Sequence, residues 1–294
     1  MSDPVGQLRS LEAKHEFFVG IDSDGCAFDS MEIKHKECFI PNTINSWELQ
    51  AVARFAREAA EFVNLYSRWR GMNRFPALVM VLDLLADRPE AVERGYKPPE
   101  IGSLRAWIEA ETRLGNPALE VKVAETSDPV LTRTLEWSKA VNATIGRIVR
   151  GVPPLPFVTK CLDKLQDAAD MMVVSATPIE ALRREWDEND IARYVRMICG
   201  QEQGTKKEHL KYGAVGKYDP SRILMIGDVP GDLKSAQANN VLFYPIRPGN
   251  EEASWQRLYD EAADKFLAGE YAGDYQVALI DEFMQSLPSK PPWK

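Results

Sequence analysis

Two carboxylates separated by one residue, Asp22 and Asp24, stand directly after a short apolar segment, Phe17–Ile21. The segment has the length and composition of a buried strand, and in an open α/β sheet ligands bind outside the carboxyl ends of the strands. Gly25 permits a tight backbone path after the pair, so both acids can converge on one small volume. Such close like charges repel each other unless a cation or a shared proton relieves them. The pair therefore indicates a functional site; the alternative is an Asx-rich turn that follows the strand.

Three later loops carry small hydroxyl, basic or acidic residues at the ends of expected strands or the starts of expected helices. Taken alone, each loop is what an N-cap or a turn requires. Taken together and in this order, the loops predict a single joint site. They are Ser175-Ala176-Thr177, Gly204-Thr205-Lys206-Lys207 and Gly227-Asp228-Val229-Pro230-Gly231-Asp232.

The elements that would position these loops alternate between short apolar strands and helices from Phe157 onwards. This alternation predicts a Rossmann-like, doubly wound, mostly parallel α/β sheet in which Phe17–Ile21 is the first strand. The carboxyl ends of neighbouring parallel strands meet at one edge, so such a sheet can gather the loops. The other expected strands are 171–174, 197–200, 223–226 and 241–245, and the helices between them are 157–169, 178–188, 205–212 and 232–239.

A long block between the first strand and the remaining ones shows helical periodicity and no strand-like alternation. We expect helices over 47–69, 76–85 and 129–150, and a hinge over 29–45 because Pro41 interrupts any helix there. Ser46 is the expected N-cap of the first of these helices. The predicted organisation is a discontinuous α/β core, residues 15–30 and 155–294, with an inserted all-helical cap domain, residues 31–154.

The four loops resemble the motifs of the haloacid dehalogenase superfamily of phosphohydrolases. Those motifs are a DxD after an apolar strand, a Ser or Thr after a second strand, a Lys, and a GDxxxD after a third strand. The resemblance covers 17–30 and 157–244, and the helical insert lies where one class of the family carries its helical cap. Cys26 departs from the family, which more often has Thr or Val there, and we expect it to be tolerated as a small buried residue.

The resemblance implies a role for each motif residue. Asp22 is the implied nucleophile, which forms an aspartyl-phosphate with the transferred group. Asp24 is the implied general acid for the leaving alcohol and then the base for the hydrolytic water. Ser175 and the following turn at Ala176 would donate hydrogen bonds to phosphoryl oxygens. A carboxylate at position 24 favours phosphate ester chemistry, because the dehalogenating members lack one there.

Mg²⁺ is the implied cofactor, since this hard cation binds carboxylates together with phosphate oxygens. Its implied protein ligands are the Asp22 side chain, the Asp24 backbone carbonyl and the Asp228 side chain. Asp232 would support these ligands without direct contact. The metal would also relieve the repulsion between the paired carboxylates.

Basic residues are expected to contact the anionic substrate at two places. By the resemblance, Lys206 neutralises the phosphoryl charge, and Lys207 remains the alternative for that role. In the helical block, Arg70 and Arg74 stand beside aromatic residues on one expected helix face. We expect this pair to contact the second polar or anionic end of the substrate; the alternative is a solvated basic face.

The function that the resemblance implies is a Mg²⁺-dependent phosphohydrolase that acts on a small phosphorylated metabolite through an aspartyl-phosphate intermediate. One alternative is a phosphomutase that uses the same residues and returns the phosphoryl group to its substrate. The other is a binding or regulatory member of the fold that has no turnover. We expect a monomer or a homodimer.

Composition limits the class of protein and its partners. The 294 residues suffice for one large or two ordinary domains, and 45% hydrophobic and 27% charged residues are typical of a soluble globular protein. A net charge of −8 argues against a nucleic-acid partner. The four cysteines have no disulfide or zinc-like spacing, which predicts reduced thiols. Without an apolar signal segment or a membrane span, a cytoplasmic location is expected.

Overall fold

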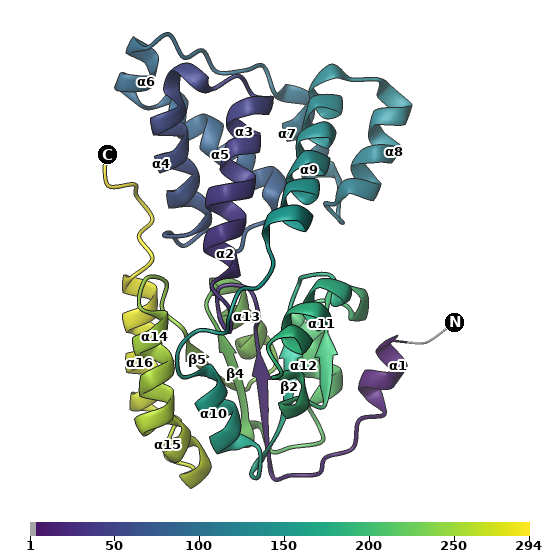
Figure 1. Ribbon diagram of the computed structural model, residues 1–294, viewed down its shortest axis with the longest axis vertical. Coiled ribbons are helices and arrows are strands. Elements are labelled where there is room, and N and C mark those ends of the chain that lie inside the picture. The colour runs from purple at the N-terminus through teal and green to yellow at the C-terminus, as the bar shows by residue number, and fades with distance from the viewer. Residues whose placement is uncertain (1–3) are drawn as a thin grey trace. The chain divides into compact units, whose positions relative to one another are not determined.

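Five parallel strands form one sheet in the order β3-β2-β1-β4-β5 in the computed structural model, which describes residues 4–294 (Figure 1). The strands are β1 (Phe17–Ile21), β2 (Ala169–Val174), β3 (Met197–Cys199), β4 (Ile223–Gly227) and β5 (Leu242–Pro245). β1 is central, and its last residue, Ile21, pairs with Val173 of β2 and Ile226 of β4. The loops after β1, β2 and β4 therefore leave from the same edge, which confirms the predicted α/β core.

Helices cover both faces of this sheet. They are α1 (Pro4–Arg9), α10 (Val158–Leu165), α11 (Ile179–Glu188), α12 (Lys206–Gly213), α13 (Pro230–Ala238), α14 (Glu251–Arg257), α15 (Ala263–Ala268) and α16 (Asp274–Gln285). Successive strand residues face opposite sides. On one side Phe18 joins a buried cluster with residues of α1, α12, α13 and α16. On the other side Phe17 meets Phe266 of α15, with ring centroids 5.1 Å apart.

The described chain divides into two compact units. The sheet and its helices form the first unit, residues 4–31 and Gly151–Leu287. The second unit comprises Glu32–Arg150 together with Pro288–Lys294. The sequence-based boundaries placed all of 155–294 in the core, and the structure differs from them at this C-terminal end.

Helices make up the second unit, and none of its described residues lies in a strand, in agreement with the predicted all-helical block. The chain enters it through α2 (Ser30–Ile33). A π-helical segment (Lys34–Phe39), α3 (Ile40–Ser46), α4 (Ala53–Asn64), α5 (Arg74–Ala86), α6 (Pro89–Glu93), α7 (Gly102–Ala110), α8 (Asn116–Thr126) and α9 (Pro129–Ile148) follow. At its centre, the Phe75 ring stands edge-on to Trp107 and Trp137, at centroid distances of 5.0 and 6.3 Å.

The segment 29–45, predicted as a hinge, is mostly helical. α2, the π-helical segment and α3 follow one another without a break, so Ser46 ends a helix and does not cap one. Pro41, the second residue of α3, directly follows the π-helical segment, which changes the regular i→i−4 hydrogen-bond pattern at the point where proline has no N–H to donate. The helix predicted over 47–69 is shorter than expected and is limited to α4 after a 3₁₀ turn.

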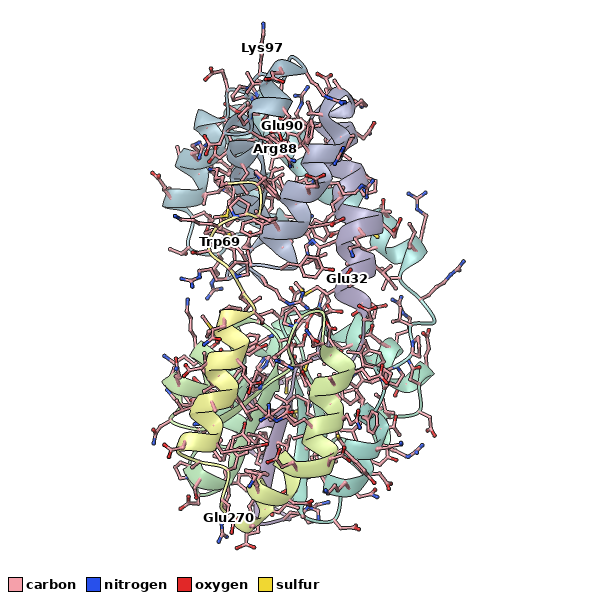
Figure 2. All side chains as sticks on the ribbon, turned by 90° about the vertical axis from the view of Figure 1, so that its left-hand side faces the viewer. Glu32, Trp69, Arg88, Glu90, Lys97 and Glu270 are labelled. Carbon is pink, nitrogen blue, oxygen red and sulfur yellow. The ribbon has the colours of Figure 1, made fainter. Side chains whose placement is uncertain are left out.

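The C-terminal residues of the second unit pack against its helices. The Arg68 N–H donates to the carbonyl of Pro288 at 3.3 Å. The Trp293 ring stands edge-on to Phe62, with centroids 5.8 Å apart, and the guanidinium of Arg88 lies 4.7 Å from the centroid of the Trp293 ring. Figure 2 labels Arg88 among the side chains of the helical unit. Aromatic and cation–π contacts of this kind outweigh the tendency of a chain end to fray.

Replacing Trp293 with alanine is expected to lower the free energy of unfolding of the helical unit by about 1–2 kcal/mol, because one aromatic and one cation–π contact are lost. Chemical denaturation followed by circular dichroism measures this change. Lys290→Ala, at an exposed position of the same segment, serves as the control and should have no effect. Equal stability of Trp293→Ala and the control would show that the segment does not stabilise the unit.

The four cysteines all lie in the described part of the chain, where they are buried and form no disulfide. Burial raises the pKa of the Cys161 and Cys199 thiols to about 12, so these side chains stay protonated. The pKa of Cys26 is also raised, first by burial and then by nearby carboxylates. Among residues 4–294, no helix combines the length and the apolar character that a membrane crossing requires.

Candidate active site

Asp22 stands at the end of the central strand and is only 3% exposed. Its N–H donates to the carbonyl of Ile226 at 3.0 Å and so continues the ladder between β1 and β4. Directly afterwards the chain turns, because the N–H groups of Cys26, Ala27 and Phe28 all donate to the carbonyl of Ser23. The Ser23 N–H itself donates to Asp22 Oδ1 at 2.8 Å. Strand and turn together hold one carboxylate at the edge of the sheet.

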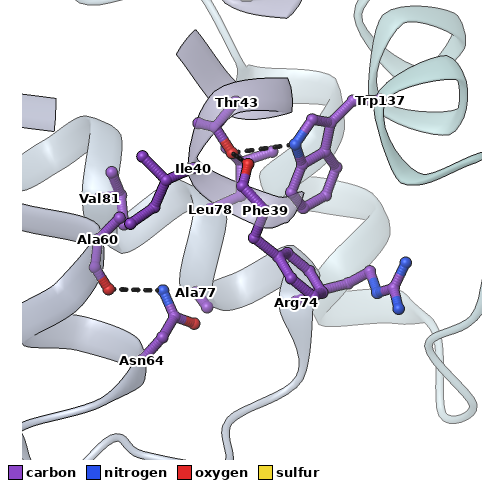
Figure 3. A pocket seen from close by; sticks show the side chains of 10 residues that line it. All are labelled: Phe39, Ile40, Thr43, Ala60, Asn64, Arg74, Ala77, Leu78, Val81 and Trp137. Carbon is purple, nitrogen blue, oxygen red and sulfur yellow. Dashed lines mark hydrogen bonds between the residues drawn. The ribbon is translucent and has the colours of Figure 1, made fainter. Parts of the chain in front are cut away.

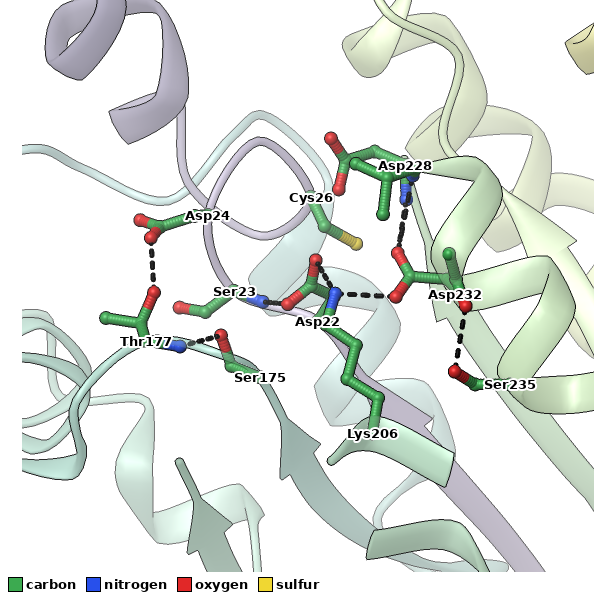
Figure 4. A network of polar contacts seen from close by, with 12 residues as sticks. Asp22, Ser23, Asp24, Cys26, Ser175, Thr177, Lys206, Asp228, Asp232 and Ser235 are labelled. Atoms are coloured by element: carbon green, nitrogen blue, oxygen red, sulfur yellow. Dashed lines mark hydrogen bonds and ion pairs between the residues drawn. The ribbon is translucent and has the colours of Figure 1, made fainter. Parts of the chain in front are cut away.

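Lys206 lies between two carboxylates, with its Nζ 2.7 Å from Asp22 Oδ2 and 2.5 Å from Asp232 Oδ1 (Figure 4). It is the first residue of α12, which Thr205 caps by accepting a backbone N–H of the first turn. Burial alone would lower the pKa of Lys206, but the charges of Asp22 and Asp232 outweigh burial and raise it. The neighbouring Lys207 is exposed. Of the two lysines that the sequence left open, Lys206 is the one at the carboxylates.

The turn after β4 supplies two further carboxylates, Asp228 and Asp232, and both side chains are fully buried. Asp232 Oδ2 accepts from the N–H groups of Asp228 and Val229, at 3.2 and 3.3 Å. Burial raises the pKa of Asp232, and the charge of Lys206 opposes that rise. Asp232 therefore connects the turn after β4 to Lys206, and Lys206 in turn contacts Asp22 at the end of β1.

The side chains of Asp22, Asp228 and Asp232 offer a set of oxygens that suits a cation. One carboxylate oxygen from each residue lies within 4.8 Å of the others. Because buried charges are costly unless compensated, the single positive charge of Lys206 leaves two of the three negative charges to be balanced. A divalent cation with a preference for carboxylate oxygen matches that balance. The residues present therefore fit the Mg²⁺ that the motif resemblance implied.

The Asp24 side chain points towards Thr177 and away from this cluster (Figure 4). Its Oδ2 accepts from the Thr177 hydroxyl at 2.6 Å, and its Oδ1 accepts from the Ser30 hydroxyl at 2.5 Å. The carboxylate is thus separate from the three that could hold a metal. This separation is compatible with the implied division of roles, in which only the backbone carbonyl of Asp24 would contact the cation.

Ser175 stands at the end of β2, one strand away from Asp22, and is 2% exposed. Its N–H donates to the carbonyl of Cys199 at 3.1 Å, which continues the pairing of β2 with β3. The Ser175 hydroxyl oxygen accepts from the N–H of Thr177 at 3.3 Å, and Ala176 between them is exposed. The turn that the sequence predicted at a phosphoryl group therefore opens at the same edge as Asp22.

Arg70 and Arg74 do not share a helix face as predicted, because α4 ends at Asn64 and Gly71 adopts φ +78° in the loop between the two arginines. Arg70 is only 4% exposed, and its guanidinium donates to the carbonyl of Leu65 at 2.9 Å. The hydrogen bond of Arg70 to Leu65 lies within the helical unit, and the substrate contact expected for Arg70 and Arg74 stays a prediction.

Arg74 begins α5, and its guanidinium donates to Asn142 Oδ1 at 2.7 Å and to the Ser138 hydroxyl at 3.0 Å. It also lies 5.0 Å from the centroid of Phe39, and burial lowers its pKa to about 10. A cavity of about 20 Å³ adjoins these residues, and the guanidinium points out of it (Figure 3). That volume holds about one water molecule, so the cavity is too small for a metabolite.

Sequence reasoning did not assign roles to several polar side chains around the carboxylates. The Ser23 hydroxyl donates to Glu185 Oε2 at 3.1 Å and accepts from Trp186 Nε1 at 3.0 Å, which ties the Asp22 turn to α11. Thr177 and Ser30 both donate to Asp24. Thr177 lies inside the motif Ser175-Ala176-Thr177 and could have been found there, whereas no motif marked Ser30 or Trp186 as functional.

Gly227→Ala is expected to lower the free energy of unfolding by about 1–3 kcal/mol through overpacking. A Cβ at Gly227 would lie 2.5 Å from the Cβ of Asp232 and closer still to its Oδ2, so the side chain that binds Lys206 must shift. Thermal unfolding measures the effect, and Gly231→Ala is a matched control, because its Cβ would meet nothing closer than Val229 Cγ2 at 3.7 Å. Equal stability of the two variants would contradict the close approach.

No family model and no curated protein matches the chain. Solved structures match over most of its length: β-phosphoglucomutase from Clostridium difficile is 13% identical over 86% of this chain and 97% of that one, with a TM-score of 0.48. A haloacid dehalogenase-like hydrolase from Streptococcus pneumoniae is 12% identical over 82% of this chain and 90% of that one, with a TM-score of 0.44. A HAD-superfamily hydrolase of subfamily IA from Geobacter sulfurreducens is 16% identical over 80% of this chain and 90% of that one, with a TM-score of 0.39. At such low similarity these matches carry no argument, and the function proposed below rests on the site's own residues.

Proposed function

We propose that the chain is a Mg²⁺-dependent phosphohydrolase that acts on a small phosphorylated metabolite through an aspartyl-phosphate on Asp22. The observation that carries the proposal is the meeting of three buried carboxylates and one lysine at the end of the central strand. Nucleophile, charge compensation and phosphoryl contacts then come from four loops that are far apart in the sequence. Asp24, half-exposed in the same turn as Asp22, is a further carboxylate that a structural ion-pair cluster does not include.

In the first half-reaction, a carboxylate oxygen of Asp22 forms a bond to phosphorus while the bond from phosphorus to the substrate oxygen breaks. Asp24 gives its proton to the departing oxygen, so the leaving group departs as an alcohol. Lys206 lies against Asp22 and offsets negative charge on the transferred group. Ser175, with its hydroxyl at the same edge, donates a hydrogen bond to a phosphoryl oxygen.

In the second half-reaction, a water oxygen forms a bond to phosphorus and gives its proton to Asp24. The bond from phosphorus to the Asp22 oxygen breaks, which releases phosphate and restores the free carboxylate. Covalent catalysis of this kind replaces one difficult displacement with two easier ones. Asp24 ends the cycle with the proton that it held at the beginning, so the chemistry is balanced.

Asp22 and Asp228 would hold the Mg²⁺, and Asp232 would keep them in place through Lys206 and the turn after β4. When bound, the cation neutralises phosphoryl charge and brings the phosphate close to an otherwise repulsive carboxylate. The chain's own part is to keep this charge cluster buried and aligned. Asp228 directly follows β4, the strand next to β1, so the two proposed ligands lie on neighbouring loops.

A phosphate-release assay over a panel of phosphorylated metabolites tests the proposal, with Asp22→Asn as the blank. We expect release in the presence of Mg²⁺, a loss of at least about a hundredfold on chelation, and recovery when Mg²⁺ is restored. Isomerisation of a sugar phosphate without phosphate release would favour the phosphomutase instead. If Mg²⁺-loaded protein released phosphate from no member of the panel, the enzyme proposal would be wrong and the binding or regulatory function would replace it.

A further inference from the structure

The carboxyl group of Asp24 is held at both of its oxygens by hydroxyl groups from separate segments. Ser30 donates to Oδ1 at 2.5 Å and Thr177 donates to Oδ2 at 2.6 Å. Both distances are at the short end of the range for a hydroxyl donating to an oxygen atom. The donors to Asp22 and Asp232 are of a different kind: backbone N–H groups and the Lys206 ammonium.

Thr177 also connects Asp24 to the turn that carries Ser175. Its N–H donates to Ser175 Oγ at 3.3 Å while its hydroxyl reaches Asp24. One residue therefore sets the distance between the phosphoryl-binding turn after β2 and the acid in the turn after β1. A threonine suits this place, since its branched side chain has few rotamers and its hydroxyl both donates and accepts.

The backbone of Thr177 is itself held by a close approach. Its carbonyl accepts from the N–H of Gln201 at 3.1 Å. A Cβ at Gly200 would lie 2.5 Å from that carbonyl oxygen and 2.8 Å from the N–H nitrogen of Ile179, so only glycine leaves the turn undisturbed. The segment after β3 thus holds the backbone of Thr177 in place through Gly200 and Gln201.

We propose that Thr177 and Ser30 are positioning residues for Asp24: their hydroxyls hold its carboxyl group in one orientation, and Thr177 couples that orientation to the Ser175 turn. This inference rests on the proposed phosphohydrolase function and adds two residues to which that proposal gave no role. Asp24 acts on the leaving oxygen, so misplacing it slows departure of poor leaving groups most. Good leaving groups need little protonation and should be nearly unaffected.

Two aryl phosphates with different leaving groups, p-nitrophenyl phosphate and phenyl phosphate, separate this role from general damage. The quantity to measure is kcat/KM, which reports steps only up to formation of the aspartyl-phosphate. For Thr177→Val we expect a loss of about tenfold to a hundredfold with phenyl phosphate and less than about threefold with p-nitrophenyl phosphate. Thr177→Ser keeps the hydroxyl and should remain within about threefold of the parent on both substrates. Thr159→Val, an exposed threonine of α10, is the matched control and should change neither value.

Gly200→Ala displaces Thr177 without changing any group that reaches Asp24, so it should reproduce the same preference for the better leaving group. It also keeps the inference testable if Thr177→Val fails to fold, which thermal unfolding reveals. Equal losses on both substrates in folded variants, or no loss on either, would overturn the positioning role. An unmodified protein that hydrolyses neither aryl phosphate would instead count against the proposed function.

Discussion

Asp22→Asn is expected to lower kcat for phosphate release by at least about a thousandfold, since it removes the nucleophile from a catalytic set that acts as a unit. The amide has nearly the shape of the carboxylate and takes one negative charge out of a buried cluster of three. We therefore expect the metal-free variant to unfold at the same temperature as the parent or at a higher one. Loss of activity without loss of stability distinguishes a chemical role from a structural one.

Steady-state phosphate release and thermal unfolding, measured on the same preparations, provide this comparison. Asp167→Asn makes the identical replacement at an exposed position of the same unit and should leave both quantities unchanged. An Asp22→Asn variant that keeps a tenth or more of the parent kcat would exclude Asp22 as the nucleophile. A variant that loses activity only because it unfolds would leave the cluster with a structural role alone.

The largest expected effect on stability comes from Asp170 of β2, which is 2% exposed. Its Oδ2 accepts from the Lys14 N–H at 2.7 Å and the Tyr218 hydroxyl at 2.6 Å, while its Oδ1 lies 3.1 Å from both His15 Nδ1 and an Arg196 nitrogen. Asp170→Asn turns an N–H group towards some of these donors and leaves Arg196 without its charge partner. We expect the free energy of unfolding to fall by about 3 kcal/mol.

The same network makes stability depend on pH. Burial alone would raise the pKa of Asp170, but hydrogen bonds, first from Tyr218 and then from Lys14 and His15, bring it from 3.8 to about 2. Because the folded pKa lies below the unfolded one, the stabilisation is present above pH 4 and is lost as the pH falls towards 2. A shift of this size corresponds to about 2 kcal/mol.

Urea denaturation of the parent and of Asp170→Asn, at a series of pH values between about 6 and 2, measures both the stability loss and its dependence on pH. The stability difference should be largest near neutral pH and should shrink as Asp170 of the parent becomes protonated. Asp281→Asn, at an exposed position, is the control for a change of one surface charge. A difference that stays constant across the acid range would contradict the depressed pKa.

The strands and the site loops could be predicted from the sequence because local signals and tertiary structure agree there. Apolar segments such as Phe17–Ile21 and 223–226 are buried on both faces of the sheet, and a buried parallel strand is an uninterrupted apolar run. Each segment is followed by a polar turn at the carboxyl end of the strand. The capping threonine before Lys206 likewise marks the start of α12 within the sequence itself.

The features that the sequence misrepresented depend on contacts that no local pattern contains. Pro41 marks a helix break locally, yet a π-helical turn before it lets the helix continue. Arg70 and Arg74 were expected on one helix face, but α4 ends at Asn64 and Gly71 adopts φ +78° between them. Trp293 packs against Phe62 and Arg88, which are distant in sequence, so no local pattern marks these contacts.

Chemical trapping of the covalent intermediate tests the central claim most directly. Single turnovers with Mg²⁺ and a substrate from the panel are stopped in acid and treated with borohydride, which reduces an acyl phosphate to an alcohol. Peptide mass spectrometry then locates the reduced side chain. We expect it at position 22, in an amount that depends on substrate and is absent from Asp22→Asn. Reduction at Asp228 or any other carboxylate, or none during active turnover, would contradict the capture of the phosphoryl group by Asp22.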